Sequence, residues 1–190
     1  MPRDAEATKA RIFAAASAEF AAHGIAGARV ERIARAANAN KQLIYAYFGD
    51  KEGLFNAVLE HALRELAHSV PPDGDDVEDY VDRLFDYHSQ HPEVSRLLLW
   101  EALEYGDRPV PSEPERTAHY QDKVDAMARA GRSGDALGPD VLTLFLLGLV
   151  GWPNAVPQVR RMLLGPDGPE QRERLRAAVR VAARRLTRPA

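Results

Sequence analysis

Residues 30–51 have the sequence VERIARAANANKQLIYAYFGDK. Their apolar residues recur at helical spacing, which predicts two short helices, over residues 30–37 and about 41–48. Between them, Asn38-Ala39-Asn40 predicts a tight polar turn, because Asn tolerates the left-handed backbone conformation better than most residues. The positions that we expect to be buried are Ile33, Ala34, Ala37, Ile44 and Phe48.

The outward face of the second helix has a composition suited to nucleic acid. With Ile44 and Phe48 turned inward, Lys and Gln side chains and two Tyr rings remain on the surface. Lys and Gln can hydrogen-bond base edges in the major groove of DNA, and a short helix fits that groove. We therefore expect a helix-turn-helix unit whose outward residues are Lys41, Gln42, Leu43, Tyr45, Ala46 and Tyr47.

The composition is that of a globular protein and excludes several classes of site. The chain has 190 residues, of which 45% are hydrophobic and 28% charged. It has no cysteine, which excludes a disulfide scaffold, a thiolate zinc site and a cysteine nucleophile. The net charge of −3 argues against indiscriminate nucleic-acid binding. Asp4 and Glu6 interrupt any export signal, and the longest apolar run, residues 141–152, is shorter than the ~20 residues of a spanning helix. We expect a cytoplasmic protein without a membrane partner.

The remainder of the chain also has the pattern of helices. Gly24 is expected to end the first helix, and Asp50 is expected to cap the fourth. Pro153 and Pro157 are expected to kink or interrupt the eighth. The fold class is therefore all-α, with about nine helices: a three-helix DNA-binding domain over residues 1–50, and a larger helical domain over residues 51–190. The other helices are expected over residues 6–23, 51–70, 76–91, 93–105, 115–130, 140–164 and 170–187.

The segment from Thr8 to Leu59 carries several motifs in register. They are Ile12-x-x-Ala15-Ala16-x-x-x-Phe20-x-x-x-Gly24, Val30-x-x-Ile33-Ala34-x-x-Ala37, Lys41-x-x-Ile44-Tyr45-x-Tyr47-Phe48 and Lys51-Glu52-x-Leu54. In these motifs the chain resembles the TetR/AcrR family of transcriptional repressors. It departs from the family at Asn38, where Gly is usual, and at Ala28 and Arg29, where Thr or Ser often precedes the second helix.

The resemblance implies roles for the outward residues. It places Lys41, Gln42, Leu43 and Ala46 at base edges, and Tyr45, Tyr47 and Lys51 at phosphates. Arg29 could replace the missing phosphate contact of the usual Thr or Ser. Asn40 could cap the third helix, contact DNA, or both. The alternative for the two tyrosines is that they pack between helices.

The resemblance also implies that residues 51–190 form an effector-binding and dimerisation domain, with an effector pocket between its helices. Its candidate residues are large, mostly aromatic and occasionally polar, which suits a largely apolar or aromatic small molecule. The alternative is that these side chains form ordinary core. The candidate residues are Tyr80, Leu84, Tyr87, His88, Trp100, Leu103, Tyr105, His119, Tyr120, Phe145 and Trp152.

Two C-terminal helices carry more apolar surface than a small domain can bury. The last helix is also rich in arginine, so a second nucleic-acid surface is the alternative. We expect instead a homodimer through a four-helix bundle, because the apolar residues recur at steps of three and four. The expected interface residues are Leu142, Phe145, Leu146, Leu149, Leu175, Val179, Ala182 and Leu186.

Signals for a metal, a cofactor or an enzyme are weak or absent. His88 and His91 could share a metal with Asp86 or His119, but an isolated histidine pair is weak support, and we expect no metal. No GxGxxG, P-loop, GxSxG or HExxH motif occurs, so we expect neither a cofactor nor an enzyme. The predicted function is sequence-specific DNA binding by a homodimeric, ligand-released repressor on a palindromic operator. The alternatives are a helical small-molecule-binding protein or enzyme with a vestigial helix-turn-helix, and a helical adaptor that pairs with another protein.

Overall fold

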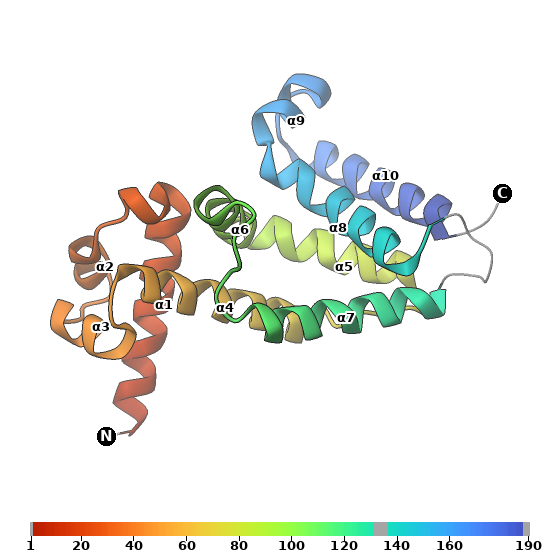
Figure 1. Cartoon of the computed structure of the whole chain (residues 1–190). Coiled ribbons are helices and arrows are strands. Elements are labelled where there is room, and N and C mark those ends of the chain that lie inside the picture. The colour runs from red at the N-terminus through yellow and green to blue at the C-terminus, as the bar shows by residue number, and fades with distance from the viewer. Residues whose placement is uncertain (1, 131–136, 188–190) are drawn as a thin grey trace. The chain divides into compact units, whose positions relative to one another are not determined.

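The structure is a computed structural model that describes residues 2–130 and 137–187. Every regular element in these residues is a helix, so the all-α class is confirmed (Figure 1). They form ten helices rather than about nine, because residues 140–164 form two helices instead of one. The bounds are α1 Pro2–Gly27, α2 Val30–Ala36, α3 Lys41–Phe48, α4 Lys51–Ser69, α5 Val77–Gln90, α6 Pro92–Tyr105, α7 Glu113–Ala130, α8 Pro139–Ala155, α9 Pro157–Leu164 and α10 Pro169–Thr187.

The chain divides into two compact units. The first consists of Met1–Glu65 and Glu93–Pro111, and the second of Leu66–Pro92 and Ser112–Ala190. The domain boundary expected after residue 50 falls at the start of α4, but most of α4 belongs to the first unit. The exact domain boundary therefore stays a prediction.

The first unit is built around a core of completely buried aliphatic and aromatic side chains. Phe20 of α1 meets Phe55 of α4 edge to face, with ring centroids 5.2 Å apart, a geometry that aromatic pairs favour. Ile33 of α2 and Ile44 of α3 enter the same core and are 0% exposed. These contacts fix α2 and α3 on α1 and α4, so the opposite surface of α3 is free to meet a partner.

Gly24 interrupts α1 where the first helix was expected to end, but α1 resumes after this kink and ends at Gly27. The φ of 68° and ψ of −178° at Gly24 lie in a region that is essentially restricted to glycine. A Cβ atom at this position would lie 2.7 Å from the ring of Trp100 on α6. The carbonyl of Ala21, in the turn before this kink, accepts hydrogen bonds from Arg96 Nε at 2.6 Å and Trp100 Nε1 at 3.3 Å. Side chains of α6 thus satisfy a carbonyl group next to the kink in α1.

The second unit contains an ordered arrangement of charges between α5 and α10, which pack against each other. Acidic residues at spacing four on α5 face arginines at spacing four on α10, and the two sequences run in opposite directions. These pairs account for three of the six arginines of α10, so half of its arginine content needs no second nucleic-acid surface to explain it. We call the arrangement the α5–α10 ladder; its pairs are Glu78 with Arg184, Asp82 with Arg180, and Asp86 with Arg176.

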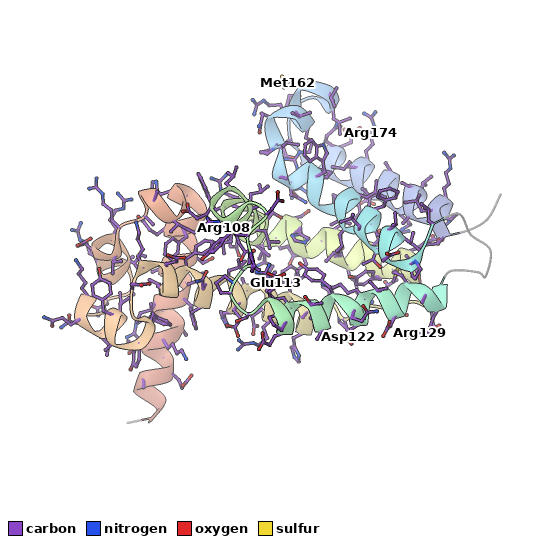
Figure 2. The ribbon with its side chains drawn as sticks, viewed as in Figure 1. Arg108, Glu113, Asp122, Arg129, Met162 and Arg174 are labelled. Atoms are coloured by element: carbon purple, nitrogen blue, oxygen red, sulfur yellow. The ribbon has the colours of Figure 1, made fainter. Side chains whose placement is uncertain are left out.

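The two C-terminal prolines act at different places. Pro153 lies inside α8, which continues to Ala155, whereas Pro157 begins α9. The bend between α8 and α9 is 85°. Along the described residues no single helix is long and apolar enough to cross a membrane, and α8 with α9 meets that length and composition only as this bent pair. Met162, near the end of α9 in Figure 2, is 73% exposed.

Candidate DNA interface and effector lobe

The turn between α2 and α3 adopts the conformation that its asparagines predict. Asn38 has a φ of 48°, in the left-handed region that Asn tolerates better than most residues. The Ala39 N–H donates to the carbonyl of Ala34 at 2.9 Å. Asn is thus sufficient where the resemblance leads us to expect Gly, and the helix-turn-helix geometry is retained.

Asn40 caps α3 and also holds the next outward side chain. Its Oδ1 accepts the backbone N–H of Gln42 at 2.8 Å, which satisfies one free donor of the first turn. Its Nδ2 donates to Gln42 Oε1 at 3.2 Å. The capping role is confirmed, and Asn40 additionally orients the amide of Gln42.

Within the described residues of the first unit, no other element covers the outward face of α3 completely, so this face is accessible to a binding partner. Tyr45 is 37% exposed and Tyr47 is 45% exposed, so neither ring is fully packed between helices. Gln42 and Ala46 are exposed, while Lys41 and Leu43 are half-buried. The Lys41 ammonium lies 5.5 Å from the centroid of the Tyr45 ring. The six residues predicted to face outward thus keep accessible surface.

Several cations near this face are held by groups of the same unit. The Lys51 ammonium donates to the carbonyls of Ala26 at 3.1 Å and Ala28 at 3.4 Å, so it caps the chain end of α1 rather than standing free for a phosphate. Lys41 forms an ion pair with Glu31 of α2. Arg29 is exposed, and its side chain makes no ion pair with another described residue.

Glu19 is a residue whose role the sequence did not reveal. Its side chain is 10% exposed, and Oε1 accepts the backbone N–H of Arg29 at 2.8 Å and Arg32 Nε at 2.8 Å. The hydrogen bonds from Arg32 hold the pKa of Glu19 below its usual value. Glu19 therefore replaces the cap that Ala28 and Arg29 cannot supply to α2. The sequence signal for this role was the position of Glu19 in the row of apolar residues along α1, where a carboxylate needs a partner.

The expected effector residues separate into groups. Tyr80, Leu84 and His88 lie along α5 in the second unit and are at most 7% exposed; Tyr87 is half-buried beside them. His119 and Tyr120 are partly exposed on α7. Phe145 and Trp152 line a groove on the same unit. The remaining three, Trp100, Leu103 and Tyr105, belong to the first unit.

These three residues of α6 have other surroundings. Trp100 covers Gly24, so its large ring is explained by packing. Leu103 is 76% exposed. The Tyr105 hydroxyl donates to Glu52 at 2.7 Å. These three side chains therefore have local roles or exposure within the first unit, and their part in an effector site stays a prediction.

Polar groups of α5 and α7 are buried within the second unit. The Tyr80 hydroxyl has no hydrogen-bond partner within the described residues, and burial raises the pKa of Tyr80 to about 12. Lys123 is 7% exposed, and its ammonium lies 4.7 Å from the Tyr120 ring centroid. Burial lowers the pKa of Lys123 to about 8 and that of His88 to about 4. Polar groups buried at such a cost are typical of functional sites.

An apolar groove of about 630 Å³ lies between α8 and α10. Of the expected interface residues, Phe145, Leu149, Leu175, Val179, Ala182 and Leu186 line it, together with Trp152. Leu142 and Leu146 are only 4% and 1% exposed. They belong to the interior of the unit, which corrects the expected interface at these two positions.

The acidic and histidine side chains of the described residues do not form a metal site. Over residues 2–130 and 137–187, no three His, Asp or Glu residues are arranged to hold one. The His91 ring instead lies against the Tyr87 ring, with centroids 4.4 Å apart and the two planes tilted by 33°.

Two family models together match most of the chain. Residues 12–58 match the bacterial regulatory proteins of the tetR family, and residues 76–185 match the tetracyclin repressor-like C-terminal domain. The chain belongs to the TetR family. As a TetR-family protein it is a DNA-binding transcriptional regulator.

Individual TetR-family relatives support the assignment over the full length. The HTH-type transcriptional repressor SCO4008 of Streptomyces coelicolor is 53% identical over 188 residues, which cover 97% of each chain. The HTH-type transcriptional repressor NicS of Pseudomonas putida is 34% identical over 55% of this chain and 52% of its own. The crystal structure of the regulator SCO4942 from Streptomyces coelicolor has a TM-score of 0.75 at 32% identity, covering 93% of this chain and 96% of that chain.

Proposed function

We propose that this TetR-family regulator is a repressor that binds a palindromic operator as a homodimer and is released by a small-molecule effector. Repression is supported by the name of SCO4008, a transcriptional repressor with which the chain shares 53% of its residues. The observation that carries the proposal is the exposed face of α3, whose inner face is anchored by the fully buried Ile44.

The chemistry of this face suits a major groove. Lys41 can donate to guanine O6 and N7, and Gln42 can pair with adenine N6 and N7. Leu43 and Ala46 can contact thymine methyl groups. Tyr45 and Tyr47 offer hydroxyls to phosphates at the flanks.

Arg29 extends the same proposal to the start of α2. It is exposed at the N-cap of that helix, where a guanidinium can reach a phosphate oxygen. Arg35, exposed in the last turn of α2, adds a second phosphate contact that the sequence pattern did not single out. Lys51 reaches a phosphate only by leaving the carbonyls of Ala26 and Ala28.

A homodimer follows from the apolar groove between α8 and α10. Phe145 is 47% exposed and Trp152 is 62% exposed, which is costly surface to leave in water. A second copy of the same two helices would cover it with a twofold axis, as in a four-helix bundle. Two recognition helices related by that axis bind the two halves of a palindrome, and together they make enough contacts for specificity.

The effector site that we propose lies in the second unit, around Tyr80, Leu84 and His88 of α5 and Tyr120 of α7. Its surfaces suit a largely apolar or aromatic molecule that also accepts a hydrogen bond from the buried Tyr80 hydroxyl. The effector lowers operator affinity in proportion to its preference for the state that does not bind DNA. The protein acts in the cytoplasm, where its operator lies.

The proposal is tested with purified protein and the DNA upstream of its own gene, in a gel shift over a salt series. A specific, salt-dependent shift at a palindrome by a homodimer supports it. Absence of any shift favours a small-molecule-binding protein or enzyme with a vestigial helix-turn-helix. A heteromer with another protein favours an adaptor. Titration of the shifted complex with apolar and aromatic ligands tests release, and a complex that no ligand dissociates would refute induction.

A further inference from the structure

Lys41, the first residue of α3, does not extend freely from the recognition surface. Its ammonium is paired with the carboxylate of Glu31, in the first turn of α2. The pair bridges the turn between the two helices, and the Lys41 and Glu31 side chains are 42% and 60% exposed. The hydrogen bond raises the pKa of Lys41 and lowers that of Glu31, so both groups stay charged at neutral pH.

Glu31 therefore cancels the formal charge of the recognition helix. The sequence of α3, KQLIYAYF, contains no other charged residue. Within the part of this unit that the structure describes, two other cations have comparable local partners: Arg32 binds Glu19, and Lys51 binds backbone carbonyls. The pair with Glu31 differs from these because it lies directly beside the outward residues Gln42 and Tyr45.

We propose that Glu31 is a specificity-determining residue that restrains Lys41 until a guanine edge displaces it. This rests on the proposed operator binding. On non-operator DNA the attraction comes from phosphates alone, and it scales with the number of phosphates that cations neutralise. A Lys41 that stays paired with Glu31 neutralises none of them. On the operator, the guanine O6 and N7 acceptors replace the carboxylate, so Lys41 contributes where the sequence is correct.

Glu31 also limits where the Lys41 ammonium can lie. The carboxylate is on one side of the Lys41 side chain, and the Tyr45 ring, 5.5 Å from the ammonium, is on the same helix one turn further on. A lysine held between these groups starts close to its binding position. A lysine released from Glu31 can reach phosphates on either strand, whatever the base sequence.

The test compares Glu31→Gln with the parent on an operator duplex and on a scrambled duplex of equal length. Fluorescence anisotropy over a salt series gives the affinity and its salt dependence. For the scrambled duplex we expect roughly fivefold tighter binding at physiological salt and a salt slope steeper by about 0.9, the effect of one additional neutralised phosphate. Operator affinity changes less, so the ratio of the two affinities falls.

Glu60→Gln is the matched control. Glu60 is also an exposed carboxylate of the first unit and pairs with Arg64 on α4, so this variant changes the net charge equally. It is expected to leave both affinities and both slopes close to those of the parent. A thermal unfolding curve for each variant shows that the fold is retained.

Lys41→Ala, alone and combined with Glu31→Gln, distinguishes two effects of removing the Glu31 charge. One is the release of Lys41 to bind phosphates, and the other is the loss of repulsion between Glu31 and the phosphates. In the Lys41→Ala background we expect Glu31→Gln to have no further effect on the scrambled duplex. An equal gain in that background would overturn the proposal, because the carboxylate would then act directly on phosphates or through Arg29. An unchanged scrambled-duplex affinity in Glu31→Gln alone would also overturn it. A parent protein that binds both duplexes equally would refute operator binding itself.

Discussion

Arg176 of α10 donates hydrogen bonds from Nε and Nη2 to the two carboxylate oxygens of Asp86 on α5, each at 3.0 Å. Arg184 makes the same two-point contact with Glu78 two turns further along. Such paired contacts fix geometry as well as charge. The α5–α10 ladder thus sets the register of α10 on α5, and with it the shape of the apolar groove that α10 shares with α8.

Replacing Asp82→Asn should destabilise the protein. Asp82 is the buried member of the ladder, 3% exposed, and its Oδ2 faces both Arg176 and Arg180. The variant keeps the volume but removes the charge that both guanidinium groups face. We expect a loss of about 2 kcal/mol in the free energy of unfolding, less than for a fully buried pair, because both arginines can be partly hydrated. Urea unfolding measures it.

Asp79→Asn serves as the control for this loss. Asp79 pairs with Arg83 four residues along the same helix, and both side chains are substantially exposed. Such pairs contribute below about 0.5 kcal/mol. Equal losses in Asp79→Asn and Asp82→Asn would mean that the ladder has no special role in stability.

Gly24→Ala should be more destabilising than a change at another glycine with positive φ. The alanine must adopt a backbone conformation that is costly for it and place its Cβ 2.7 Å from the Trp100 ring. The expected loss is about 3 kcal/mol, combining backbone strain with overpacking. Gly106→Ala, at φ 58° with no atom within 4 Å of the added Cβ, should lose about 1 kcal/mol. Similar losses in the two variants would contradict the role of Trp100.

Lys123→Met should stabilise the protein at neutral pH. Lys123 is 7% exposed and has no carboxylate partner among the described residues, and burial lowers its pKa from 10.5 to about 8. Below pH 8 both the folded and the unfolded chain are protonated, and the parent bears the full cost of the buried charge. A gain of about 2 kcal/mol is expected from removing it.

The pH dependence gives a second readout for Lys123. Between pH 8 and 10.5 the folded parent has released the Lys123 proton while the unfolded chain still binds it. The stability of the parent therefore rises with pH in this window, and its difference from Lys123→Met shrinks. Lys9→Met, at an exposed lysine, should follow the parent. A constant difference across the window would show that Lys123 is not held at a depressed pKa.

The sequence predicted those parts of the fold that depend on one residue and its neighbours. The positive φ of Asn38, the break at Gly24 and the caps supplied by Asn40 and Asp50 all follow from local needs: a left-handed backbone, or an acceptor for a free N–H. Asp50 Oδ1, for example, accepts the Gly53 N–H at 2.7 Å. Such requirements are visible in residue type alone.

The sequence could not predict which helix faces meet. Arg176 and Asp86 are 90 positions apart, and charges at spacing four are equally compatible with a solvated helix face. For the same reason Trp100 could be assigned to an effector pocket, although its ring packs on Gly24. A large aromatic residue at helical spacing has the same pattern in a core, in a pocket or at an interface. The same ambiguity applies to Leu142 and Leu146, which have the pattern of an interface but are buried inside the second unit.

Phe145→Arg should disrupt the proposed homodimer. Phe145 is 47% exposed in the groove between α8 and α10, where a second copy would bury an unpaired charge. Light scattering should show a monomer at concentrations at which the parent is dimeric. Leu103→Arg, at a leucine that is 76% exposed on α6, should remain dimeric. If Phe145→Arg also remains dimeric, the α8–α10 groove is not the interface.

Gln42→Ala and Tyr47→Ala should weaken DNA binding in different ways. Gln42, whose amide is oriented by Asn40, is expected to contact one base, so its loss should cost about 1–3 kcal/mol on the operator and relax the preference at that base pair alone. Tyr47→Ala should weaken binding to operator and scrambled duplexes alike, because a phosphate contact carries no sequence information.

Tyr47→Phe separates the hydroxyl of this residue from its ring. The Tyr47 ring packs edge to face on Phe48, with centroids 6.0 Å apart, and phenylalanine retains that contact. If the hydroxyl binds a phosphate, Tyr47→Phe should weaken binding nearly as much as Tyr47→Ala. If only Tyr47→Ala weakens it, the ring supports α3 through packing and the phosphate contact is refuted. Binding by Gln42→Ala with unchanged base preference would likewise remove Gln42 from the recognition surface.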